Sequence, residues 1–128
     1  MTRLMRFWLA VGASVFAVSG FCAQELPDPL LAGWQGEPVC EVLEQDTRLR
    51  VLRCSFAPGV GHERHFHAPH WGYALEGGLM RLTDSSGVRE ARLKTGSSFS
   101  SEGTPWHEVL NIGDTTVTYL IVEPLPVQ

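Results

Sequence analysis

The sequence predicts an all-β domain, built as a sandwich or a barrel. Short apolar runs recur between turn sequences rich in glycine, proline, aspartate and serine, and no stretch after residue 30 keeps a helical periodicity for three turns. The chain has 128 residues, which is enough for one domain and too few for two. Strands are expected at residues 49–56, 71–75, 79–83, 88–93, 107–110 and 116–122.

Composition excludes several classes of partner. Hydrophobic residues make up 44% of the chain and charged residues 19%, with a net charge of -4. There is no run of lysine or arginine, whereas a nucleic-acid surface or an anionic lipid surface requires a basic patch. We therefore expect no nucleic-acid partner.

The N-terminus has the pattern of a secretory signal peptide over residues 1–23. Arg3 and Arg6 precede an uncharged apolar run over residues 7–23, which is short for a membrane span of about 20 residues. Cleavage would give a secreted or periplasmic protein without a membrane anchor. The mature chain would begin with an N-terminal extension over residues 24–39. The alternative is an uncleaved membrane anchor.

Two cysteines remain after the predicted cleavage. Residues 39–43 and 49–56 are expected to form a hairpin, and a register centred on Thr47 places Cys40 opposite Cys54. In an oxidising compartment such a pair is a candidate disulfide. The alternative is two buried free thiols that pack as small apolar groups.

The histidines are clustered. Four of the five lie within nine residues and the fifth is His107. His65 and His67 are two positions apart, so on a strand their side chains point to the same face, which favours a metal site. His62 precedes them in an expected loop. A solvated side chain is the ordinary interpretation there, and a base near the metal is the alternative.

His70 requires a separate argument, because it is three positions after His67. Pro69 interrupts the strand, so a new strand can begin at His70 with its alternation reset. His70 would then share a face with Gly72 and Ala74, whose small side chains would leave space for a substrate beside the metal.

The first histidine segment resembles the first cupin motif, G-x5-H-x-H-x(3,4)-E-x6-G. Gly59, His65 and His67 match it, and His70 to Gly77 keeps the E-x6-G spacing. The link after His67 is one residue short, and histidine replaces the usual glutamate.

The second motif, G-x5-P-x-G-x2-H-x3-N, is matched by Gly96, His107 and Asn111. Glu102 and Thr104 stand where the motif has proline and glycine. The chain is therefore similar to a small single-domain cupin over about residues 40–124.

This resemblance implies a double-stranded β-helix, or jelly-roll barrel, with a metal inside. The family's ligand positions correspond to His65, His67, His70 and His107, a four-histidine variant of the site. Imidazole ligands suit a divalent transition metal, and sequence does not choose among Mn, Fe, Ni, Cu and Zn.

Three functions fit this pattern. The first is a metal-dependent dioxygenase or isomerase acting on a small molecule, with catalytic residues that the sequence does not assign. The alternative is a non-catalytic periplasmic cupin that binds a metal or small ligand, and the third is a barrel without metal that serves as an interaction module. The resemblance also implies a homodimer.

Overall fold

The computed structural model describes residues 25–127, so the predicted signal peptide lies outside the described residues. Within that range the chain forms eleven strands, and no helix there could cross a membrane. The strands are β1 (Gly33–Trp34), β2 (Glu37–Pro38), β3 (Cys40–Gln45), β4 (Leu49–Phe56), β5 (Gly61–His67), β6 (His70–Glu76), β7 (Gly78–Asp84), β8 (Gly87–Leu93), β9 (Ser98–Ser101), β10 (Thr104–Asn111) and β11 (Val117–Pro124).

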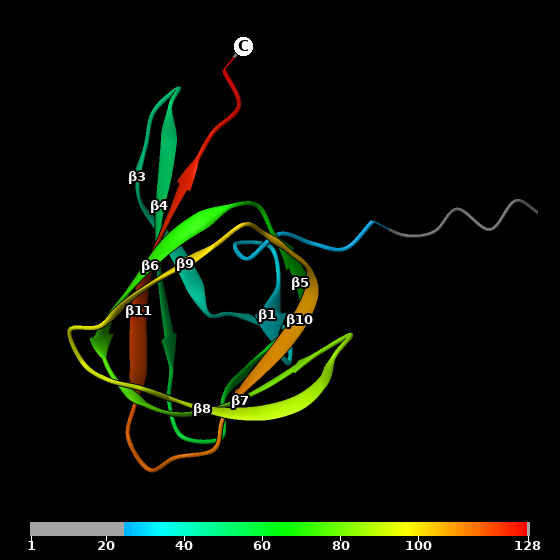
Figure 1. The fold of residues 1–128 in the computed structure, drawn as a ribbon, viewed down its shortest axis with the longest axis vertical. Helices are drawn as coiled ribbons and strands as arrows, with labels where there is room; N and C mark the ends of the chain where they lie inside the picture. The colour runs from blue at the N-terminus through cyan, green and yellow to red at the C-terminus, as the bar shows by residue number, and fades with distance from the viewer. Residues whose placement is uncertain (1–24, 128) are drawn as a thin grey trace, which may run out of the picture.

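Two antiparallel sheets face each other and enclose the interior (Figure 1). One sheet has five strands in the order β3-β4-β11-β6-β9, and the other has four in the order β5-β10-β7-β8. The chain crosses between the sheets several times, which gives the jelly-roll barrel that the sequence predicts. The short β1–β2 ribbon lies against β5, outside the two main sheets.

Alternation along the central strands builds the core. In β11 every second residue is buried, and Val117 and Ile121 are completely inaccessible to solvent. Leu52 and Phe56 of β4 are also fully buried and complete this part of the core. Burial of each such side chain contributes about 1.5–3 kcal/mol relative to exposure.

Cys40 and Cys54 form a disulfide, so the alternative of two free thiols is wrong. The two residues are direct partners in the β3–β4 register, as the centre at Thr47 predicts. Asp46 shapes the turn, because its Oδ1 accepts hydrogen bonds from the backbone N–H groups of Arg48 and Leu49.

The structure departs from the expected strands in several places, of which three concern the histidines or the sheet edge beside them. Strand β5 begins at Gly61, so His62 belongs to a strand and is 1% exposed, and its placement in a solvated loop is wrong. Strand β9 was not expected, because Ser98–Ser101 is mostly hydrophilic and pairs only with the edge of β6. Strand β10 begins at Thr104 rather than at His107.

The segment before β3 packs on the barrel. The carbonyl of Pro27 accepts a hydrogen bond from the backbone N–H of Phe66, and the ring of Trp34 covers Gly61. A Cβ on Gly61 would lie 2.7 Å from that ring, so this close approach requires glycine. The contact brings the N-terminal segment beside the strand that carries His65 and His67.

Candidate metal centre

Two neighbouring strands bring three histidines together. Strand β5 directs His65 and His67 to the interior, where they are 0% and 7% exposed. In β10, His107 is the register partner of His65, and irregular pairing on both sides of it marks a bulge. Bulges of this kind re-aim side chains, and here the imidazole of His107 turns toward those of β5.

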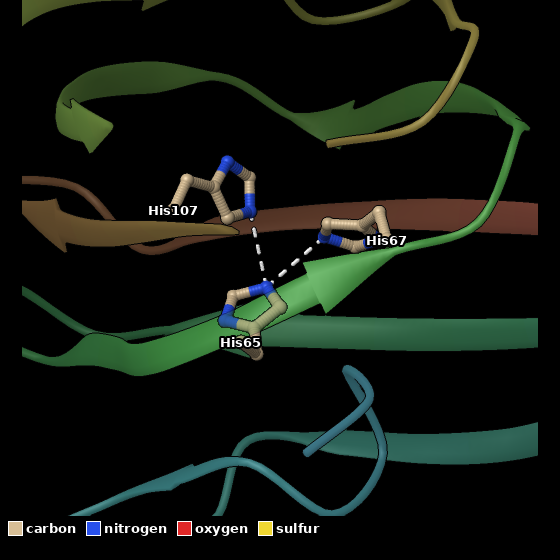
Figure 2. A group of neighbouring side chains, drawn as sticks. All are labelled: His65, His67 and His107. Carbon is tan, nitrogen blue, oxygen red and sulfur yellow. Dashed lines mark hydrogen bonds between the residues drawn. The ribbon is translucent and has the colours of Figure 1, made fainter. Parts of the chain in front are cut away.

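The ring nitrogens of the three histidines converge (Figure 2). His65 Nε2 lies 3.0 Å from His67 Nε2 and 3.0 Å from His107 Nε2. One ligand atom from each residue lies within 4.8 Å of the others. The structure thus brings together three of the four predicted ligands.

The backbone fixes the tautomer of His65. Its Nδ1 lies 2.6 Å from the carbonyl oxygen of Glu63, which can only accept, so Nδ1 carries the proton. A neutral imidazole has one N–H, and Nε2 therefore presents a lone pair to the other two histidines. This is the tautomer that a metal ligand needs.

Burial keeps the cluster neutral. Removal from water, together with the neighbouring imidazoles, lowers the pKa of His107 to about 4 and that of His67 to about 2. Burial also lowers the pKa of His65. Neutral imidazoles can bind a metal at pH 7, whereas protonated ones cannot.

His70 lies at the edge of this cluster, at the start of β6. Its ring centroid is 4.6 Å from that of His67, and its Nδ1 donates to the carbonyl of Ala68, which leaves a lone pair on Nε2. Its role as a fourth ligand stays a prediction.

The alternation reset after Pro69 is confirmed, since Gly72 and Ala74 are buried on the inner face and Trp71 is exposed on the other. The space beside Gly72 is not open, however. A Cβ at that position would collide with the ring of Phe99, which fills it.

A cavity of about 310 Å³ lies beside the histidines. His67, His70 and His107 line it, as do the polar residues Arg92, Ser97 and Ser98. Most of the remaining wall is apolar: Met80, Leu82, Leu93, Phe99, Val109, Ile121 and the ring of Tyr119. Burial raises the pKa of the Tyr119 hydroxyl, so it remains protonated at neutral pH. The cavity can hold a small, largely apolar molecule next to the cluster.

The residues present fit a transition metal. Three neutral imidazoles are a donor set that Zn, Cu, Fe and Ni accept. One buried side-chain atom among the described residues also has no hydrogen-bond partner, and it is Nδ1 of His67. If Nε2 of His67 were a metal ligand, the ring proton of His67 would be on Nδ1. A metal bound there would act as a Lewis acid on an oxygen atom of a ligand in the cavity.

The motif residues that are not histidines have structural roles. Gly59 and Gly96 adopt φ angles of +80° and +81°, which favour glycine. Asn111 is buried, and its amide nitrogen donates to the carbonyls of Phe56 and Thr115. The asparagine therefore ties the loop after β10 to the end of β4.

Sequence reasoning missed Glu123, which lies next to the cluster, and its partner Arg50. Glu123 is 3% exposed and forms a salt bridge of 2.6 Å with Arg50. Its Oε1 lies 4.0 Å from His67 Nδ1. The alternation of β11 was the available signal, because Glu123 is in phase with the buried Val117, Tyr119 and Ile121.

Comparisons with known proteins agree with this architecture. The sequence model described as a cupin domain matches residues 52–123. A cupin-domain protein from Bordetella pertussis superposes with a TM-score of 0.65 at 21% identity, over 80% of this chain and 99% of that one. No curated protein matches the sequence significantly.

Two further solved structures share the fold. The polyketide cyclase RemF from Streptomyces resistomycificus superposes with a TM-score of 0.57 at 21% identity, over 76% of this chain and 75% of its own. A predicted oxalate decarboxylase from Thermotoga maritima gives 0.53 at 20% identity, over 68% and 79%. At such identities these likenesses concern the fold alone. With the family match spanning more than half of its length, the chain belongs to the cupin family.

Proposed function

We propose that this protein is a metal-dependent cupin that binds one divalent transition metal and a small molecule beside it. His65, His67 and His107 would be ligands, with His70 as a fourth. The observation that carries this proposal is the convergence of three imidazoles, two of which, His67 and His107, line a cavity. The reaction class would be that of a dioxygenase or an isomerase.

The cavity indicates the chemistry of the small molecule. Its walls are mainly apolar, which favours a ligand with an apolar body. The histidine shell is neutral and leaves the positive charge on the metal, which favours an oxygen donor with negative charge. Two cupin-fold proteins named as a polyketide cyclase and a predicted oxalate decarboxylase support small-molecule chemistry on this scaffold.

Export of the protein remains part of the proposal. The Cys40–Cys54 disulfide supports it, because disulfides persist in oxidising compartments. N-terminal sequencing of protein from its native host tests it, and a mature N-terminus within residues 21–25 is expected. A soluble cytosolic protein that retains Met1 would contradict export.

We also propose a homodimer, supported by apolar side chains on the outer face of the five-stranded sheet. Trp71 and Leu75 are 42% and 39% exposed there. Sedimentation equilibrium should give twice the chain mass. A purely monomeric species would overturn this proposal without affecting the metal site.

Metal analysis and a blocked cavity together test the function. The purified protein is loaded with Mn, Fe, Ni, Cu or Zn and screened for oxygen consumption or isomerisation with small carbonyl and carboxyl compounds. In Leu82→Trp, an indole placed in the cavity wall should abolish turnover and leave metal occupancy at one. Val88→Trp adds the same side chain at a residue that is 65% exposed and should leave turnover unchanged.

Each outcome of this experiment has a separate meaning. Metal binding with small-molecule binding but no turnover would favour the non-catalytic cupin. A protein that takes up none of the five metals would overturn the proposed function.

A further inference from the structure

Nδ1 of His67 is an acceptor or donor without a partner, in a place where no water reaches it. The side chain is 5% exposed, and the nearest carboxylate atom is Oε1 of Glu123 at 4.0 Å. That distance is too long for a hydrogen bond by about 1 Å. A buried polar atom in this state carries a cost in free energy unless a partner is provided.

Glu123 is held firmly in its position. Arg50 contacts Oε2 twice, through a hydrogen bond from Nε at 2.8 Å and an ion-pair contact from Nη2 at 2.6 Å, and Oε1 is the oxygen that faces His67. Arg50 Nη2 also contacts Asp28 Oδ2 at 2.8 Å. The Oδ1 atom of Asp28 accepts hydrogen bonds from the backbone N–H groups of Leu30 and Leu31, which hold the Asp28 carboxylate in place.

The tautomers explain why His67 and Glu123 stay apart. Nε2 of His65 carries a lone pair, because the single ring proton of His65 is on Nδ1. The 3.0 Å contact between the two Nε2 atoms is then a hydrogen bond only if His67 carries its proton on Nε2. In that tautomer Nδ1 of His67 carries a lone pair and faces a carboxylate oxygen. Two acceptors cannot form a hydrogen bond with each other.

Metal ligation through Nε2 of His67 would require the other tautomer. The single proton would then reside on Nδ1, which would become a donor aimed at Glu123 Oε1. A closing movement of about 1 Å would bring the two atoms to hydrogen-bond distance. Ligating histidines usually donate their second ring N–H to such a partner, which orients the ring and raises its basicity.

We propose that Glu123 is a positioning residue of the metal centre that accepts the Nδ1–H of His67, and that Arg50 and Asp28 hold it there. This inference rests on the proposed function for the metal itself. The three charged residues carry a net charge of -1. They therefore supply the negative charge that a histidine-only ligand set lacks, although they do not contact the metal themselves.

Metal affinity of the folded protein tests the proposal without any need for turnover. Zn²⁺ binding is measured in competition with a chelator, for the parent chain, Glu123→Gln and Glu41→Gln. Loss of an outer-shell partner typically lowers metal affinity by about 10- to 100-fold, and we expect this for Glu123→Gln. Glu41 forms a similar but exposed pair with Arg53 on the same sheet, so Glu41→Gln should change affinity less than about twofold.

A double variant separates positioning from a purely structural ion pair. Replacing Glu123 alone leaves the buried Arg50 with Asp28 as its one remaining partner of this group, which can destabilise the fold. Arg50→Leu/Glu123→Leu removes both charges and keeps the interior filled. If Glu123 serves His67, the double variant still binds Zn²⁺ at least about tenfold more weakly. If the pair is only structural, the double variant recovers the affinity of the parent, and the proposal is overturned.

Nitrogen-15 NMR of the imidazoles reports which ring nitrogen carries the proton, and a change in the stability of the fold does not alter that result. In the Zn²⁺-loaded parent, Nδ1 of His67 should carry the proton and Nε2 should show the shift of a ligating nitrogen. A proton on Nε2 of His67 in the loaded protein would overturn the proposal. A parent that binds no metal would overturn both this inference and the proposed function, whereas unchanged affinity in Glu123→Gln would overturn only this inference.

Discussion

The imidazole of His62 stacks on that of His65, with ring centroids 3.8 Å apart and an interplanar angle of 30°. The Nε2 atom of His62 points away from the cluster and donates to the carbonyls of Pro29 and Ala32, at 3.0 Å and 3.2 Å. A predicted metal ligand is thus backed by a second histidine, which is itself fastened to the N-terminal segment.

His62 should therefore support the fold without binding the metal. His62→Ala removes the stacking and leaves two carbonyls without their donor, so the free energy of unfolding in urea should fall by about 1–3 kcal/mol. His62→Phe keeps an aromatic ring against His65 and should retain one metal per chain by elemental analysis. Loss of metal from a folded His62→Phe would show that the ring nitrogens matter directly.

Each of the three converging histidines should be required for metal binding. His65→Ala, His67→Ala and His107→Ala each remove one inner-shell bond, and elemental analysis after dialysis should find little metal. Glu108→Gln alters the exposed neighbour of His107 and serves as the matched control with full occupancy. Full occupancy in any of the three alanine variants would exclude that residue as a ligand.

His70→Ala tests the fourth ligand. The Nε2 lone pair of His70 is available because Nδ1 donates to Ala68, and the ring lines the same cavity as His67. We expect affinity for Zn²⁺ to fall nearly as far as in the other ligand variants, measured by chelator competition. Affinity equal to that of the parent would reduce the site to three histidines.

Acid should destabilise the protein as pH falls from about 6.5 to 4. Burial lowers the pKa of His62 to about 3 and that of His107 to about 4, from an ordinary value of 6.5. In this window the unfolded chain protonates these residues while the folded chain keeps them neutral. The unfolded state then binds more protons, so the free energy of unfolding decreases as pH falls.

Urea denaturation at several pH values measures this slope. His62→Phe removes one of the buried imidazoles and should give a shallower decline than the parent. A stability that stays constant from pH 7.5 to 4.5 would contradict the lowered pKa values.

Reduction of the disulfide should lower stability by about 3 kcal/mol, on the chain-entropy estimate for a loop of this length. The sequence separation between Cys40 and Cys54 is 14 residues. Urea midpoints with and without dithiothreitol measure the effect, and Cys40→Ala/Cys54→Ala should show no response to the reductant. An equal response in that double variant would mean that the reductant acts elsewhere.

The regular parts of this fold could be predicted because their sequences alternate. Strand β11 reads as buried at every second residue, and the two histidines of β5 share a face as their spacing requires. His62 could not be placed from sequence, because glycine and proline before it predict a turn. Its burial depends on carbonyls at residues 29 and 32, a tertiary contact that no local pattern reports.

The site was predicted as far as its histidines and no further. His65, His67 and His107 follow from spacing and motif, whereas the proposed partner of His67 comes from β11, far from β5 along the sequence. The position of Glu123 relative to His67 depends on how the two sheets are packed. A charged residue in phase with buried apolar ones was the only local sign of it.

The pairing of β10 with β5 also determines when the cluster can form. His65 and His107 are 42 positions apart, and their rings meet only after the two strands have paired. An unfolded chain offers only the local group around His65, so the complete three-histidine cluster forms only once the barrel has formed. A metal captured by the finished barrel would chiefly slow its unfolding, because the β5–β10 pair could not separate until the ion had left.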